Sequence, residues 1–150
     1  MRKNLDAIIL TRQELQIMKV VWELGSATVK DVCDAISLTK PTAYTTILTL
    51  MGILETKGAL VHERAGRAFL YTPLLSRQQA TKNQVVDMLT RFFEGAPEKM
   101  VEYVVQNEFK NSEQFANVRN MLWQWEATLV APPEDKSWEP RPAFMNISED

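Results

Sequence analysis

Four threonines at helical spacing are the first residues in the sequence whose type and position could do chemistry. Thr42, Thr45, Thr46 and Thr49 recur at intervals of three and four residues, which brings them to one side of an α-helix. A threonine hydroxyl can bond phosphate oxygens or base edges, and its methyl group can contact the thymine methyl. Because β-branched residues are poor helix formers, the set indicates a DNA-contacting surface. Threonines that are merely exposed are the alternative interpretation.

The helix that must position these threonines is predicted from about Thr42 to Lys57. Pro41 suits its first turn, and Gly58 suits its end. Lys40 comes just before it, and Tyr44 lies to one side of the threonines, so both are candidate DNA contacts. Apolar residues on the opposite side of the helical wheel are predicted to pack on a core. Those apolar residues are Ile47, Leu50, Met51 and Leu54.

Two shorter helices are predicted before this one. Thr11 and Glu14 have the spacing of a capping box at the start of the first helix, and Gly25 ends it. Thr28 caps the second helix, with Asp31 in its first turn. Together with the threonine-bearing helix, these segments predict a helix-turn-helix.

The hydrophobic period changes to two after the third helix. Leu60–Arg64 and Ala68–Thr72 are predicted strands, and Ala65–Arg67 is predicted as the tip of a hairpin. Arg64 and Arg67 are placed there for phosphate or minor-groove contacts; a solvated hairpin is the alternative. Residues 1–75 are therefore predicted to form a winged helix-turn-helix DNA-binding domain.

The second half of the chain predicts three more helices and a tail. Ser76 caps the first, Gly95 and Pro97 break it, and Ser112 starts the last. Residues 127–150 are acidic and rich in proline, which predicts an extended tail. The overall fold class is thus mainly α with a small β-hairpin.

Composition restricts the class of protein. The chain has 150 residues, of which 45% are hydrophobic and 24% charged, as in a globular domain. Its net charge is -2, but residues 1–75 carry 9 Lys/Arg against 7 Asp/Glu and residues 76–150 carry 8 against 12. This asymmetry indicates a mildly basic working half and an acidic second half. With no membrane-length apolar run and no secretory leader pattern, a cytoplasmic protein without a membrane partner is expected.

Residues for catalysis or metal binding are scarce. The sequence has one histidine, His62, and one cysteine, Cys33, so it predicts no internal disulfide and no metal site. Cys33 falls on an apolar helix side and is predicted to be a core residue. There is no glycine-rich phosphate loop and no paired nucleophile and base. The chain is therefore expected to have no catalytic residues and no cofactor, and not to be an enzyme.

The residues from Leu10 onward resemble the penicillinase-repressor family of winged-helix repressors, the BlaI, MecI and CopY group. The resemblance covers roughly residues 10–125, and it rests on the order and spacing of several short stretches. Arg91–Gly95 is similar to the phenylalanine-rich helix end that precedes the family's dimerisation segment. The stretches in the first half are Glu14–Trp22, Gly25–Val29, Ala43–Met51, Lys57–Gly58 and Gly66–Tyr71.

This resemblance implies a homodimer that represses transcription by binding a palindromic operator in double-stranded DNA. Two heads on a two-fold axis would bind half-sites about one helical turn apart. Residues 76–126 would then be a helical dimerisation region, which agrees with their apolar stripes; an intramolecular three-helix core is the alternative. The dimerisation candidates are Val85, Leu89, Phe92, Met100, Val104, Val118 and Leu122.

Three features depart from the family pattern. Ile53 stands where the family usually has arginine, and Gly52 beside it is unusual inside a helix. A sensor or protease that releases repression is the further partner the resemblance implies, but the usual Asn-Phe cleavage bond aligns with Tyr103-Val104. The paired cysteines of copper-responsive members are absent. A winged-helix module used for protein contacts is therefore kept as the alternative function.

Overall fold

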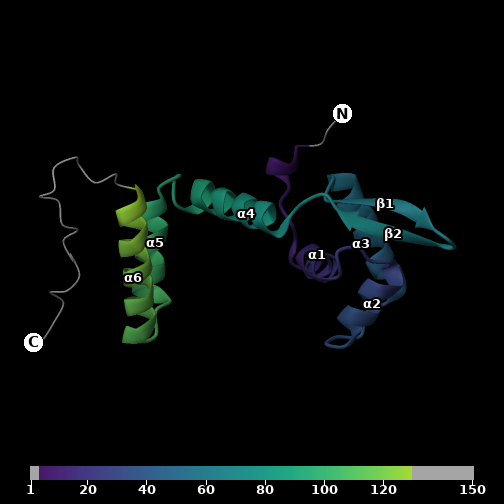
Figure 1. Cartoon of the computed structure of the whole chain (residues 1–150), viewed down its shortest axis with the longest axis horizontal. Coiled ribbons are helices and arrows are strands. Elements are labelled where there is room, and N and C mark those ends of the chain that lie inside the picture. Colours follow the sequence, from purple (N-terminus) through teal and green to yellow (C-terminus); the bar gives the residue numbers. More distant parts are fainter. Residues whose placement is uncertain (1–3, 130–150) are drawn as a thin grey trace, which may run out of the picture. The chain divides into compact units, whose positions relative to one another are not determined.

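The computed structural model describes residues 4–129, which belong to two compact units divided after Gly95. Within the described residues, the predicted class, mainly α with a small β-hairpin, is confirmed (Figure 1). The second unit contains α5 (Pro97–Asn107) and α6 (Ser112–Leu129). The first unit contains η1 (Leu5–Ala7), α1 (Arg12–Leu24), α2 (Val29–Ser37), α3 (Tyr44–Lys57), β1 (Leu60–Ala65), β2 (Ala68–Pro73) and α4 (Arg77–Phe92).

The two predicted caps set the starts of α1 and α2. Thr11 Oγ1 accepts from the Glu14 backbone N–H at 3.3 Å, and the Glu14 carboxylate accepts from the Thr11 N–H at 3.0 Å. Thr28 and Asp31 make the same reciprocal pair at 3.1 and 2.9 Å. Each box satisfies N–H groups that have no partner within the helix. Gly25 ends α1 with a φ of 81°, as predicted.

Helix α3 begins slightly later than predicted. Its N-cap is Ala43, whose backbone is extended, so Pro41 and Thr42 lie in the preceding turn and not in the helix. The Thr42 hydroxyl donates to the Lys40 carbonyl at 3.0 Å, and the Cys33 thiol lies 3.4 Å from the Thr42 carbonyl oxygen. Such local side-chain bonds offer the backbone an alternative to helical geometry.

The core of the first unit lies between the three N-terminal helices and the hairpin. Each helix buries one apolar stripe, and Cys33 packs partly buried against it, as predicted. The α3 stripe was also predicted correctly, with Leu50 at its partly buried edge. The largest fully buried side chains are Ile17, Met18, Val21, Val32, Ile47, Met51, Leu54, Leu60 and Leu75.

Strands β1 and β2 pair antiparallel, from Leu60 opposite Pro73 to Ala65 opposite Ala68. The tip is therefore Gly66 and Arg67, with Gly66 at a φ of 65°, a conformation that glycine adopts without steric cost. Ala27, before α2, exchanges two backbone hydrogen bonds with Tyr71 at 2.9 and 2.8 Å. This bridge ties the hairpin to the helices and completes a winged helix-turn-helix.

Helix α4 belongs to the first unit, although it was predicted to begin the helical dimerisation region. Its Asn83 is buried and donates from Nδ2 to the carbonyls of Leu5 and Ile8 at 2.7 and 3.0 Å. The boundary predicted after residue 75, between the DNA-binding domain and the dimerisation region, depends on which residues form the dimer and stays a prediction.

Helix α6 continues to Leu129, past the predicted tail start at residue 127. Its ladder of backbone hydrogen bonds thus includes Ala127 and Leu129, both good helix formers. The rest of the predicted tail lies outside the described residues. No helix in the described part of the chain is long and apolar enough to cross a membrane.

Candidate nucleic-acid interface

Helix α3 presents one side to the core and the opposite side to solvent. Ile47, Met51 and Leu54 are buried, which fixes the rotation of the helix about its axis. Thr45, Thr46 and Thr49 are exposed. Thr42 is half-buried in the turn before the helix, so three of the four predicted threonines share the exposed side of α3.

The hydroxyl of Thr49 has a defined role in the helix. It donates to the Thr45 carbonyl at 2.9 Å, a bond that commits its proton to the backbone. A hydroxyl has one proton and two acceptor lone pairs. The exposed edge of Thr49 therefore offers a hydrogen-bond acceptor and a methyl group.

Four further α3 residues share this exposed side and were not among the predicted contacts. Leu48 and Ile53 are 44% and 40% exposed, and Gly52 and Thr56 are exposed as well. A Cβ added at Gly52 would meet nothing within 4 Å. The helical spacing of Gly52 and Thr56 from Thr45 and Thr49 is the sequence signal that places them on this side of α3.

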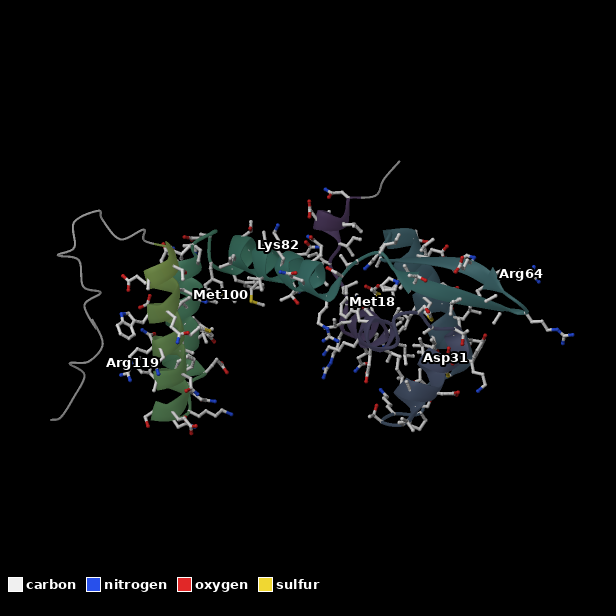
Figure 2. The ribbon with its side chains drawn as sticks, viewed as in Figure 1. Met18, Asp31, Arg64, Lys82, Met100 and Arg119 are labelled. Carbon is white, nitrogen blue, oxygen red and sulfur yellow. The ribbon has the colours of Figure 1, made fainter. Side chains whose placement is uncertain are left out.

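The remaining predicted DNA contacts flank α3. Lys40 lies in the turn before the helix and Tyr44 in its first turn, and both are exposed. Arg64 and Arg67 are exposed near the hairpin tip, and Figure 2 labels Arg64 there. The Arg64 Nε donates weakly to the Gly66 carbonyl at 3.4 Å. The charged groups of Lys40, Arg64 and Arg67 are thus exposed to solvent, the first before α3 and the other two near the hairpin tip.

A side-chain pair links α3 to the wing. His62 Nδ1 on β1 lies 2.5 Å from Glu55 Oε2 on α3, and the imidazole packs edge-on against Phe69 with ring centroids 4.7 Å apart. The described residues contain no group of three or more His, Cys, Asp and Glu side chains that could hold a metal. The contacts of His62 are those of a residue that positions the wing.

The predicted dimerisation residues divide by exposure. On α4, Val85 and Phe92 are exposed and Leu89 is partly buried. On α5 and α6, Leu122 is exposed, and the partly buried members are Met100, Val104 and Val118. Within the described chain, neither α5 nor α6 contains a fully buried residue.

Comparison with known proteins agrees with the resemblance stated from the residues. The family model described as Penicillinase repressor matches residues 10–124. The Penicillinase repressor of Bacillus licheniformis is 31% identical over 109 residues, which cover 73% of this chain and 85% of the relative. An uncharacterized 16.5 kDa protein of Latilactobacillus sakei is 35% identical over 74 residues, covering 49% of this chain and 51% of that protein.

A solved structure of the DNA-binding domain of the repressor BlaI is 35% identical to this chain. The match covers 51% of this chain and 92% of that one, with a TM-score of 0.45. The family assignment rests on the sequence matches, which extend through most of the chain. The chain belongs to the penicillinase repressor family, a family of transcriptional repressors and not of enzymes.

Proposed function

We propose that this protein is a cytoplasmic homodimeric transcriptional repressor that binds a palindromic DNA operator. The observation that carries the proposal is the exposed threonine side of α3. The opposite side of α3 packs in the core through Ile47, Met51 and Leu54. The exposed side of α3 would lie in the major groove, where an α-helix fits, and its first two turns would make the base contacts.

The threonines supply both kinds of base contact. Because the Thr49 hydroxyl donates to the Thr45 carbonyl, its oxygen is available to accept from a base edge. Amino groups of adenine and cytosine are the donors in the major groove, and the thymine methyl is the apolar partner there. Contacts from Thr49 would therefore favour these groups over the guanine edge, which presents only acceptors.

Flanking cations would hold the head on the DNA. Lys40 before α3 and Arg64 and Arg67 on the wing are exposed. Contacts to backbone phosphates position a protein without selecting sequence, and they make affinity strongly dependent on salt. Tyr44, 52% exposed at the start of α3, would add a hydroxyl contact to the same backbone.

Exposed apolar side chains support the dimer. Val85 and Phe92 on α4 and Leu122 and Trp125 on α6 are at least 40% exposed. The amphipathic helices of the second unit have no fully buried residue of their own among those described. A second copy that covers these side chains would remove their apolar surface from water, and its two-fold symmetry would match a palindrome.

The alternative, a winged helix used for protein contacts, predicts an extensive apolar surface on α3. Leu48 and Ile53 are exposed there, but they are interleaved with threonines. This mixture suits base edges and thymine methyl groups better than it suits a dry protein interface, whose centre is more apolar. Membership of a repressor family also favours DNA.

The Tyr103-Val104 bond, which aligns with the cleavage bond of other family members, lies in the middle of α5. Proteases bind extended backbone, so cleavage there would require local unfolding.

Selection from random double-stranded DNA with the purified full-length chain tests the proposal. We expect enrichment of an inverted repeat whose half-sites lie about one helical turn apart, and affinity that falls steeply as salt is raised. The double variant Thr46→Ala, Thr49→Ala should lose specific binding more than non-specific binding. Equal loss of both would mean that these threonines only position the backbone, and no enriched sequence would contradict the proposal.

Sedimentation of the free protein tests the dimer separately. We expect a dimer for the natural chain and a shift toward monomer for Leu122→Glu, because a charge would be placed among apolar side chains. The matched control is Gln124→Glu, which also adds one negative charge to α6. A monomeric natural chain at micromolar concentration would contradict the dimer.

A further inference from the structure

A groove of about 530 Å³ lies between α1 and the first half of α4, within the first unit of the chain. Leu10, Leu15 and Trp22 contribute apolar surface to its lining, and Ala80 contributes from α4. Val85, which also lines it, is one of the side chains assigned above to the proposed dimer. We call it the α1–α4 groove. Its volume is in the range of clefts that bind small organic molecules.

Cationic side chains line the same groove. Arg12 and Lys19 come from α1, and Arg77 comes from the start of α4. No aspartate or glutamate contributes to this lining, and none of the ion pairs found among residues 4–129 involves these three cations. The groove therefore combines an apolar surface with positive charge that is not neutralised by the chain itself.

The apolar surface is held in place before any ligand arrives. The Trp22 indole donates from Nε1 to the Leu75 carbonyl at 2.8 Å, which fixes the ring. The Arg77 guanidinium lies over this ring, 5.2 Å from its centroid. A ligand would thus meet an ordered aromatic surface and an ordered cation, which reduces the entropy lost on binding.

The side-chain hydrogen bonds that attach α4 to η1 are made by residues that do not line the groove. Asn83 donates to the carbonyls of Leu5 and Ile8, and Gln79 donates to Asp6 at 2.8 Å. These bonds hold α4 to η1 and the segment after it. They leave the space between α1 and α4 open as a groove.

We propose that the α1–α4 groove binds an amphipathic organic anion. The apolar body of the ligand packs against Trp22 and Leu15, and its acid group lies among Arg12, Lys19 and Arg77. Charge complementarity selects this class, because a cationic ligand would be repelled and a neutral one would leave the three cations without an acidic partner. The occupant contacts both helices, so its binding stabilises the folded first unit.

Titration of the full-length protein with 1-naphthaleneacetate tests this site. Its uncharged amide, 1-naphthaleneacetamide, has the same aromatic body and serves as the matched ligand control. We expect the acid to bind at least about tenfold more tightly than the amide in calorimetry, and to shift the NMR signal of the Trp22 indole N–H. Equal affinity for acid and amide, shifts confined to other parts of the chain, or no binding would each overturn the proposal.

The double variant Arg12→Gln, Arg77→Gln tests the role of charge. Both side chains are exposed, so the fold should tolerate the change. We expect a loss of about tenfold in affinity for the acid and little change for the amide. Lys82→Gln is the control, because Lys82 is exposed on α4 (Figure 2) but does not line the groove. Unchanged affinity in the double variant, or an equal loss in Lys82→Gln, would show that the groove does not hold the acid group.

Discussion

Glu14 Oε2 and Lys57 Nζ lie 2.8 Å apart and join the first turn of α1 to the last turn of α3. The Glu14 side chain is only 4% exposed. The same carboxylate oxygen accepts from the Thr11 N–H, and Lys57 also donates to the Ile9 carbonyl at 3.2 Å. One buried carboxylate thus caps α1 and anchors the end of the helix proposed to enter the DNA groove.

Replacing Lys57 with methionine should destabilise the protein by about 2 kcal/mol, because the buried Glu14 carboxylate would lose its counter-charge. This loss in the free energy of unfolding is smaller than for a fully buried ion pair because Lys57 is itself about one-third exposed. Urea unfolding at neutral pH measures the change. Lys30→Met is the control, since its pair with Asp34 is highly exposed and should contribute little. An equal loss in both variants would contradict a special role for Glu14 and Lys57.

Asn83→Leu should destabilise the first unit by about 2 kcal/mol, since the buried Ile8 carbonyl would lose its donor and the Leu5 carbonyl would keep only a longer 3.4 Å bond from the Ile8 N–H. Hydrogen exchange should also show faster opening of α4. Gln78→Leu, at an exposed position on the same helix, is the matched control and should leave both readouts nearly unchanged. Slow exchange of α4 in Asn83→Leu would mean that other contacts hold this helix.

Local signals in the sequence were sufficient to predict most of the first unit. The capping boxes at Thr11 and Thr28 and the apolar stripe on α3 depend on neighbours within a few residues. The period-two pattern of the hairpin is equally local. These features appear in the structure because local preference and core packing favour the same backbone.

Features that depend on distant partners were not predicted. Glu14 was identified as a capping residue, but its pair with Lys57 joins positions 43 residues apart. The start of α3 was missed for a local reason: proline suits a first helical turn, but the hydroxyl bond of Thr42 to the nearby Lys40 carbonyl favours a turn.

The capping box at the start of α2 predicts an acid-sensitive contribution to stability. The backbone N–H of Thr28 donates to the Asp31 carboxylate and lowers the pKa of that group below its ordinary value of 3.8. Its contribution is therefore complete above the ordinary carboxyl pKa and is lost as pH falls through the lowered value in the folded state. Because Asp31 is exposed, we expect under about 1 kcal/mol.

Asp31→Asn should accordingly be less stable than the natural chain near neutral pH, and the difference should shrink in acid. Urea unfolding at several pH values measures it, and an NMR titration of the Asp31 carboxyl carbon measures the pKa directly. Asp34→Asn, one turn further along α2, is the control for loss of a negative charge. A stability difference that stays constant into acid would contradict the linkage.

Gly52→Ala should raise the stability of the fold and weaken operator binding. Gly52 lies inside α3, and a Cβ there would meet nothing within 4 Å. Alanine should therefore stabilise the helix by about 0.5–1 kcal/mol, because it loses less backbone entropy on folding than glycine. Thermal unfolding of the natural and variant chains measures this gain, and a lower melting temperature would show that the position is sterically restricted.

The same substitution should weaken operator binding although it stabilises the fold. Gly52 shares the exposed side of α3 with Thr45 and Thr49, so the added methyl group would project toward the DNA and keep the helix backbone from a close approach. Thr90→Ala, exposed on α4, removes a methyl and a hydroxyl group away from the proposed DNA interface and should leave affinity unchanged. Specific and non-specific affinities, measured at one salt concentration, distinguish the outcomes. Unchanged specific binding in Gly52→Ala would restrict the contact surface to the first two turns of α3.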